Sequence, residues 1–376
     1  MERRAYLAAV GGIFLAGCTT VDDGDRSREP EPPTTRRDGP ESQRTRQTAT
    51  TRPPPESLDA IVDRLSSASD GDTVSVPADV EIDLTDRWEI RVPSGVTLEG
   101  GRDEEQSVPG ALLRSPAGDE APEYDPNRRK ILLDENARLT GFRLQGHFTD
   151  YVNPSTEHDG DYYAHRGGGG VTASHEAEVD NNEIAGWPYA GVVVHGDAHI
   201  HHNDIHHNTW EGLGYGVVVP GGTHVPLIEA NYFNYNRHSI TASGSSAGYE
   251  ARHNVVGPDW VGAQFDVHGT EGMQGIAGDR IVIERNTFQA TTSVAAKTRK
   301  PDAEFPAIHI RGTPIEGAWI ERNWFYHDDR ESAVKNPDSY EKIHFESNHY
   351  GQTEPTTDSI GAATNRSSSM QYPSGE

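Results

Sequence analysis

Two short stretches of the chain, FDVHG and IHIRG, carry side chains that could transfer protons. Asp266 and His268 stand two residues apart in the first stretch, and His309 and Arg311 stand two residues apart in the second. An imidazole can act as a base or an acid near neutral pH, and a guanidinium can hold a carboxylate or an oxyanion. The carboxylate of Asp266 could orient a histidine or bind a cation such as Ca²⁺. These four residues are the predicted catalytic group.

The strands that would position this group appear as a repeated phrase. Three further stretches, VVVHG, VVVPG and ITASG, also end in glycine and keep small or apolar residues at alternate positions. Side chains alternate along a β-strand. The residues that stay small or apolar in every copy of the phrase are therefore expected to face inward, and the residues that differ between copies are expected to face outward. If these strands lie side by side about 4.8 Å apart, the predicted catalytic group meets on one outer face. The structural alternative is a solvated strand face with a cross-strand ion pair.

A second phrase places asparagine at a fixed position, as in IHHNDI, IEANYF and IERNTF. Apolar residues stand three before and two after the asparagine, and Phe142 takes the same slot in LTGFRL. Successive rungs are separated by 21 to 40 residues, a period typical of a solenoid in which each repeat is one coil. The predicted row consists of Asn182, Asn203, Asn231, Asn254, Asn286, Asn323 and Asn348.

This pattern resembles the right-handed parallel β-helix of the pectate-lyase-like superfamily, over about Leu58 to Tyr350. The resemblance implies an all-β fold, a single-stranded right-handed parallel β-helix with a short N-terminal capping helix. It also implies that each asparagine lies at a bend inside the coil and bonds to the asparagine of the next turn, which satisfies buried amide groups. The activity motifs of polygalacturonases and pectate lyases are absent, so the resemblance concerns the fold.

The start of the domain fits this interpretation. In SLDAIVDRLSSAS, apolar residues recur at helical spacing behind Ser57, which is a plausible N-cap. The stretches DTVSVP, VEIDLT and IRVPSGVTLEGG follow. They contain runs of alternating apolar and polar residues that are interrupted by proline and glycine, and such runs predict short strands. We therefore expect a capping helix and then the first coils.

Long insertions and nearby polar residues suggest substrate contacts. Residues 147–169 and 289–306 both enter between an asparagine strand and a glycine-ended strand, so they are expected to wall a groove beside the predicted catalytic group. Tyr162 and Tyr163 in the first insertion could stack on sugars, or could pack locally within a long loop. Arg237, His238 and His195 are the other predicted substrate contacts.

The run HIHHNDIHHN offers a separate hypothesis. His199 and His201 would share the outer side of a strand and, with His206 or His207 after the bend, could hold Zn²⁺. No cysteine assists, and the sequence does not establish the third ligand that such a site requires. No metal site is therefore assigned from the sequence.

The N-terminal residues have the pattern of an export signal. Arg3 and Arg4 precede an apolar run that is too short to span a bilayer, and RRAYL resembles the twin-arginine motif. The run ends at Leu-Ala-Gly-Cys, which resembles a lipobox with Cys18 as the lipidation site. We predict a signal peptide at residues 1–18 and a lipid-anchored protein on the extracellular face of the cell membrane. A disordered tether at residues 19–56, a β-helix at 57–351 and a disordered tail at 352–376 complete the predicted organisation.

Charge limits the partners of this chain. The formal net charge of −26 resembles that of proteins from salt-loving archaea, where acidic residues keep the surface solvated. No basic patch stands out, which argues against nucleic acid. At molar salt the Debye length is only about 3 Å, so the charge does not exclude an anionic substrate.

Together these patterns favour a carbohydrate-active surface protein. A hydrolase needs two carboxylates at the scissile bond, whereas the predicted catalytic group has one. A lyase needs a base and a group that neutralises a uronate, so β-elimination in a uronic-acid-containing glycan is the favoured reaction. The alternatives are a glycoside hydrolase with a second carboxylate from a loop, and a non-catalytic glycan-binding or adhesion module.

Overall fold

The structure, a computed structural model, describes residues 56–85, 87–115, 128–146, 168–210, 212–222, 224–290, 305–336, 339–356 and 360–361. All of them belong to one compact unit, Pro54–Glu376. The predicted signal peptide with Cys18, and the predicted tether up to residue 55, lie outside the described residues. Export and lipid anchoring therefore stay predictions. None of the helices in the described part of the chain is long and apolar enough to cross a membrane.

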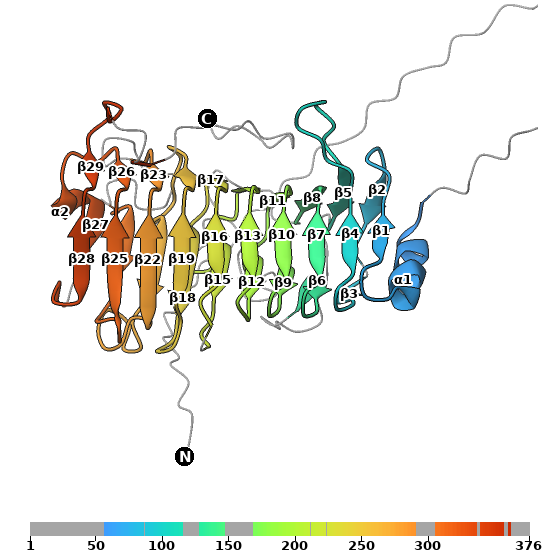
Figure 1. Ribbon diagram of the computed structural model, residues 1–376, viewed down its shortest axis with the longest axis horizontal. Helices are drawn as coiled ribbons and strands as arrows, with labels where there is room; N and C mark the ends of the chain where they lie inside the picture. Colours follow the sequence, from blue (N-terminus) through green and yellow to red (C-terminus); the bar gives the residue numbers. More distant parts are fainter. Residues whose placement is uncertain are drawn as a thin grey trace, which may run out of the picture. The chain divides into compact units, whose positions relative to one another are not determined.

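The described strands form three parallel sheets of ten, ten and nine strands, in which each strand pairs with its counterpart one coil later (Figure 1). The first sheet contains β1 (Thr73–Ser75), β4 (Thr97–Glu99), β7 (Arg138–Thr140), β10 (Glu178–Asp180), β13 (His199–His201), β16 (Leu227–Glu229), β19 (Tyr249–Arg252), β22 (Arg280–Glu284), β25 (Gly317–Glu321) and β28 (Ile343–Glu346). The second sheet contains β2 (Glu81–Asp83), β5 (Ala111–Arg114), β8 (Phe142–Gln145), β11 (Glu183–Ala185), β14 (Asp204–His206), β17 (Tyr232–Asn234), β20 (Val255–Val256), β23 (Thr287–Phe288), β26 (Trp324–Phe325) and β29 (His349–Tyr350).

The third sheet is built from the glycine-ended phrases. It contains β3 (Ile90–Val92), β6 (Arg129–Leu133), β9 (Gly169–Ala173), β12 (Ala190–Val194), β15 (Tyr215–Val219), β18 (His238–Ser243), β21 (Phe265–His268), β24 (Ile308–Ile310) and β27 (Val334–Lys335). Successive coils therefore repeat the same three strands, and the predicted parallel β-helix is confirmed.

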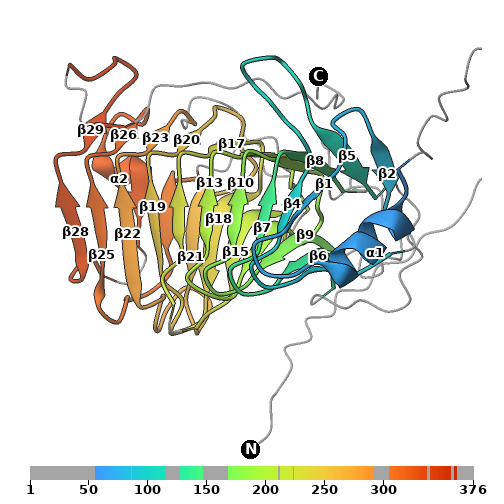
Figure 2. The same cartoon turned by 45° about the vertical axis from the view of Figure 1, so that its right-hand side comes forward.

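The helix α1 (Leu58–Ser67) lies at the N-terminal end of the stack, next to β1 and β3 (Figure 2). The Ser57 hydroxyl accepts a hydrogen bond from the Ala60 amide at 3.2 Å, as an N-cap does. Ile61 and Leu65 are buried against the first coil, so α1 covers its apolar interior as predicted. A second, short helix, α2 (Arg330–Ala333), precedes β27 and was not predicted.

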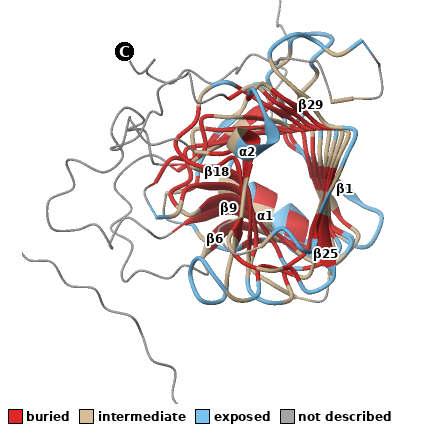
Figure 3. Ribbon diagram, turned by 90° about the vertical axis from the view of Figure 1, so that its left-hand side faces the viewer, coloured by how far each residue is buried: buried red, intermediate tan, exposed pale blue. Residues whose placement is uncertain are grey.

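The core lies between the three sheets, which surround it when the stack is viewed from its end (Figure 3). Aromatic side chains pack against one another in this core. Phe288 on β23 and Phe325 on β26 are register partners, and their rings are stacked with the centroids 4.9 Å apart, which matches the separation of paired strands. Phe265, on β21 of the third sheet, meets Phe288 edge to face, with the centroids 4.8 Å apart.

A buried row of hydrogen-bonded amides runs through the bends between the first and second sheets. The amide nitrogen of Asn254 donates to the Ile228 carbonyl and to the amide oxygen of Asn286, both at 2.9 Å. Its own oxygen accepts from the backbone and side-chain nitrogens of Asn231, both at 3.0 Å. The same contacts link Asn182, Asn203, Asn231, Asn254, Asn286, Asn323 and Asn348 in turn.

These asparagines stabilise a bend that is unfavourable by itself. The residue before each of them has a positive φ, as at Ala230 and His253, where φ is 53°. This left-handed conformation costs about 1–2 kcal/mol for a residue with a Cβ. The asparagine oxygen compensates, because it accepts the backbone N–H of the asparagine one coil earlier. Gly141 provides the same conformation without strain before Phe142.

A second, shorter row was not predicted. Asn208 donates to the amide oxygen of Asn236 at 2.9 Å, and Asn236 donates to the Ile205 carbonyl at 2.9 Å. Each stands five residues after a member of the first row and follows a residue with positive φ. This row supports the bend that leads from the second sheet into the third.

Replacing Asn254 by alanine tests the role of the first row. We expect the free energy of unfolding to fall by about 2–4 kcal/mol, because the backbone N–H of Asn231 and the Ile228 carbonyl lose their buried partner. Asn348→Ala, at the last and partly exposed rung, is the matched control and should cost less than half as much. Urea denaturation followed by circular dichroism measures both values. Equal losses would show that burial within the row has no effect.

Candidate functional site

The predicted catalytic group lies together on the outer side of the third sheet. Asp266 on β21 is paired in register with His309 on β24, and His268 and Arg311 lie close to the ends of these two strands. Arg311 contacts both carboxylate oxygens of Asp266, with Nε 2.8 Å from Oδ1 and Nη2 2.6 Å from Oδ2. The His268 Nε2 is 2.8 Å from Oδ2, and the His309 Nδ1 is 3.7 Å from Oδ1. The parallel register places the other three side chains around the carboxylate of Asp266.

Asp266 is buried, and the solvated strand face considered from the sequence does not describe this site. The side chain of Asp266 is 0% exposed, whereas those of His309, Arg311 and His268 are 15%, 23% and 27% exposed. A buried charge requires partners, and here they come from the same strand and from the next coil. Asp266 is therefore a central anchor, and the partly exposed side chains around it are the ones that can meet a substrate.

The carboxylate of Asp266 is ionised. Burial by itself favours the neutral acid, but the neighbouring His238, the contact with His268 and the charge of Arg311 together lower its pKa. The bidentate pair with Arg311 is the geometry that guanidinium and carboxylate groups prefer. The pair fixes the position of Arg311 beside the two histidines.

His238 is a fifth member of this cluster. It begins β18, and its Nε2 is 3.1 Å from Oδ2 of Asp266. Its Nδ1 donates to the Ala263 carbonyl at 2.5 Å, and complete burial lowers its pKa well below the usual value. The ring of Tyr215 lies parallel to it, with the centroids 5.9 Å apart. The sequence placed His238 at a substrate contact, whereas the structure places it beneath the surface, where it packs against Asp266.

His309 is held in its neutral form. Burial lowers its pKa to about 4, helped by the charges of Arg311 and Lys335 and opposed by Asp266. Lys335 lies on β27, paired with His309 on the coil that follows. Lys335 is not among the predicted site residues, because its stretch, AVKN, lacks the closing glycine of the repeated phrase. The available signal was the register, since Val334 and Lys335 continue the alternation one coil later.

The other predicted substrate contacts are distributed differently. Arg237 lies beside the cluster, with its guanidinium 5.8 Å from the centre of the Tyr215 ring and Nη1 donating to the Leu213 carbonyl at 3.1 Å. His195 follows β12, three strands from β21 or about 14 Å away at ordinary strand spacing. The structure does not bring His195 to the cluster. Tyr162 and Tyr163 lie outside the described residues.

The histidines of HIHHNDIHHN do not form one metal site. His199 and His201 point outward from the first sheet, where each is 2.9 Å from a glutamate, Glu229 and Glu178. His206 lies on the second sheet and is buried 3.1 Å from Glu183. The bend between β13 and β14 therefore divides the run between two sheets.

The cluster around Asp266 is a poor site for a cation. One ring nitrogen each from His238 and His268 and a carboxylate oxygen of Asp266 lie within 4.8 Å of one another, which would suit a transition metal. However, the Arg311 guanidinium already occupies that carboxylate and would repel a metal ion. Ca²⁺ fits even less well, because it requires six to eight oxygen ligands.

The positive charge of this face contrasts with the rest of the chain. The cations that act on its histidines are Arg237, Arg311 and Lys335, and Asp266 is the carboxylate among them. The chain as a whole has a formal net charge of −26. An anionic group would therefore bind more favourably here than on the acidic remainder of the surface.

A comparison with protein-family models supports the fold. A family model described as right handed beta helix region matches residues 126–256, and no curated protein sequence matches the chain. Among solved structures, the Dettilon tailspike protein aligns at 14% identity with a TM-score of 0.34, covering 78% of this chain and 64% of that chain. The PL6 family alginate lyase AlyGC aligns at 11% identity with a TM-score of 0.32, covering 82% of this chain and 52% of that chain. This chain thus spans less than two thirds of the length of either protein. The family match and the three stacked parallel sheets identify the fold as a right-handed parallel β-helix.

Proposed function

We propose that the protein is a polysaccharide lyase that cleaves a uronic-acid-containing glycan by β-elimination. The observation that supports this most is the cluster around Asp266, in which a fixed guanidinium and a neutral histidine come from the same coil. Arg311 is held by the buried carboxylate, and His309 has a pKa of about 4. This combination supplies a cation for the uronate and a base for its proton.

The first requirement of the reaction is to neutralise the uronate carboxylate. Arg311 uses Nε and Nη2 for Asp266, which leaves Nη1 and its partly exposed edge for a substrate. Lys335 on the next coil extends the positive surface along the stack. A neutralised carboxylate makes the proton on the adjacent ring carbon more acidic, since the negative charge that develops there is stabilised.

The second requirement is the proton transfer. His309 takes the proton from the carbon next to the carboxylate, and the C–H electron pair forms a carbon–carbon double bond as the glycosidic C–O bond breaks. The Nε2 of His268 is held 2.8 Å from Asp266, so its Nδ1 is the atom that can give a proton to the leaving oxygen when the ring is an imidazolium. The products are a reducing end and an unsaturated non-reducing end.

Hydrolysis is less well supported. A glycosidase uses two carboxyl groups, one as acid and one as base or nucleophile. Asp266 is ionised, buried and paired with Arg311, so it can serve neither as an acid nor as an accessible nucleophile. Within the described residues of the cluster no second carboxylate takes these roles.

Substitutions in the cluster test the proposal. On a polyuronate that the wild-type protein cleaves, His309→Ala and Arg311→Ala should each lower kcat/KM by about 100-fold or more, and His268→Ala should lower it as well. The readout is the ultraviolet absorbance of the unsaturated end, measured in high salt. His344→Ala is the matched control, because His344 is an exposed histidine on the first sheet and should leave the rate unchanged.

Each other outcome has a defined meaning. Unchanged rates in all three cluster variants would remove this site from the reaction. Release of reducing ends without ultraviolet absorbance would indicate a hydrolase. A polymer that is bound and retained intact, across a panel of uronic-acid and neutral polysaccharides, would indicate a glycan-binding module.

The pH dependence gives a second test. Because the pKa of His309 is lowered to about 4, this base is unprotonated above that pH and loses its function only as the pH falls through about 4. The acidic limb of kcat/KM should therefore have its midpoint near pH 4 and not near 6.5, the ordinary value for histidine. Circular dichroism at each pH must show a folded protein. A midpoint near 6.5 would contradict the assignment of His309 as the base.

A further inference from the structure

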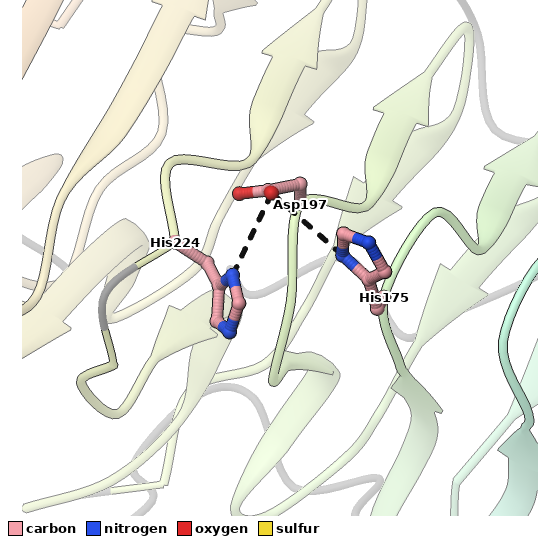
Figure 4. Close-up of side chains that lie close together, drawn as sticks. All are labelled: His175, Asp197 and His224. Atoms are coloured by element: carbon pink, nitrogen blue, oxygen red, sulfur yellow. Dashed lines mark ion pairs between the residues drawn. The ribbon is translucent and has the colours of Figure 1, made fainter.

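Another cluster of potential ligands lies where the third sheet turns into the first. His175 follows β9, Asp197 follows β12, and His224 precedes β16, so the three residues come from three successive coils. Figure 4 shows the two imidazoles on either side of the carboxylate. The Oδ2 of Asp197 is 3.7 Å from Nδ1 of His175 and 3.5 Å from Nδ1 of His224. The cluster is separate from Asp266, which lies on later coils of the third sheet.

These separations suit a metal ion better than direct hydrogen bonds. Hydrogen bonds to nitrogen donors are about 2.7–3.2 Å long, so both contacts are too long. Ligands of a tetrahedral zinc ion, with bonds of about 2.0–2.1 Å, are about 3.3 Å apart. The three ligand atoms already lie within 4.8 Å of one another. Small rotations of the side chains would bring them to that distance.

The surroundings hold two of the ligands in place. The Oδ1 of Asp197 accepts a hydrogen bond from the Val225 amide at 2.8 Å, which turns Oδ2 toward the imidazoles. A Cβ at position 196 would collide with the backbone of His175, so Gly196 permits the two turns to approach closely. Contacts of this kind orient the ligands of metal sites.

The state of His175 is an independent indication of a ligand. Its Nδ1 is buried and has no hydrogen-bond partner among the described residues, although the side chain as a whole is partly exposed. Its other nitrogen, Nε2, lies 3.8 Å from the carboxylate of Glu176. This separation is too long for a hydrogen bond, but a carboxylate on that side of the ring attracts a proton to Nε2 and so leaves Nδ1 as the free nitrogen.

The geometry points to a binding site for a divalent transition-metal ion of the zinc type, formed by His175, Asp197 and His224. Two imidazoles and one carboxylate are the ligands of such ions, whereas Ca²⁺ and Mg²⁺ prefer oxygen alone. Water completes the coordination on the exposed side. Because each ligand belongs to a different coil, the ion ties three coils together and stabilises the folded state by mass action.

The test uses the purified protein after removal of metals with EDTA. Titration with Zn²⁺ in a calorimeter should give one equivalent bound at this site, and thermal unfolding should shift upward as Zn²⁺ is added. His224→Ala should weaken this binding about tenfold or more and abolish the thermal shift. His344→Ala, an exposed histidine outside the cluster, is the control and should behave as wild type. The metal-free variants should unfold at the wild-type temperature, which shows that they fold.

Equal affinity for Zn²⁺ in His224→Ala and wild type, or no binding in either, would overturn the proposal.

Discussion

The constraint on which the structure depends is the register of the stacked coils. Every strand pairs with its counterpart one coil later, and the buried amides from Asn182 to Asn348 hold each bend at the same place. An asparagine that slipped by one residue would leave backbone groups without buried partners, so the register is strongly determined. Because the register is fixed, residues far apart in sequence become neighbours about 4.8 Å apart.

Asp266 shows what this register achieves at the site. A fully buried carboxylate is unfavourable unless it is paired, and Arg311, His268 and His238 provide the partners. Pairing fixes these side chains in turn, and the same burial keeps His309 neutral. Stability and chemistry therefore depend on the same contacts. Variants of Asp266 would disturb both, which is why the exposed members of the cluster are the more informative ones to replace.

Much of the fold could be predicted from the sequence, because it depends on local patterns that repeat. Period-two alternation identified the strands of the third sheet, and the asparagine phrase identified the bends. The gathering of Asp266 with Arg311 also followed from the pairing of adjacent strands. The depth of burial of Asp266 and His238 could not be predicted, since it depends on side chains and loops that cover the outer face. Lys335 was missed because its stretch lacks the closing glycine, and the pair Asn208–Asn236 was missed because both asparagines stand only five residues after members of the first row, well short of the period of a coil.

Mass spectrometry of the oligosaccharides that the protein releases from a polyuronate tests the central claim most directly. β-Elimination gives fragments with an unsaturated end, each lighter by one water than the corresponding hydrolysis product. The account predicts these lighter fragments, formed by the wild-type protein and not by Arg311→Ala. Fragments that carry the additional water, or a polymer that is bound but never shortened, would contradict it.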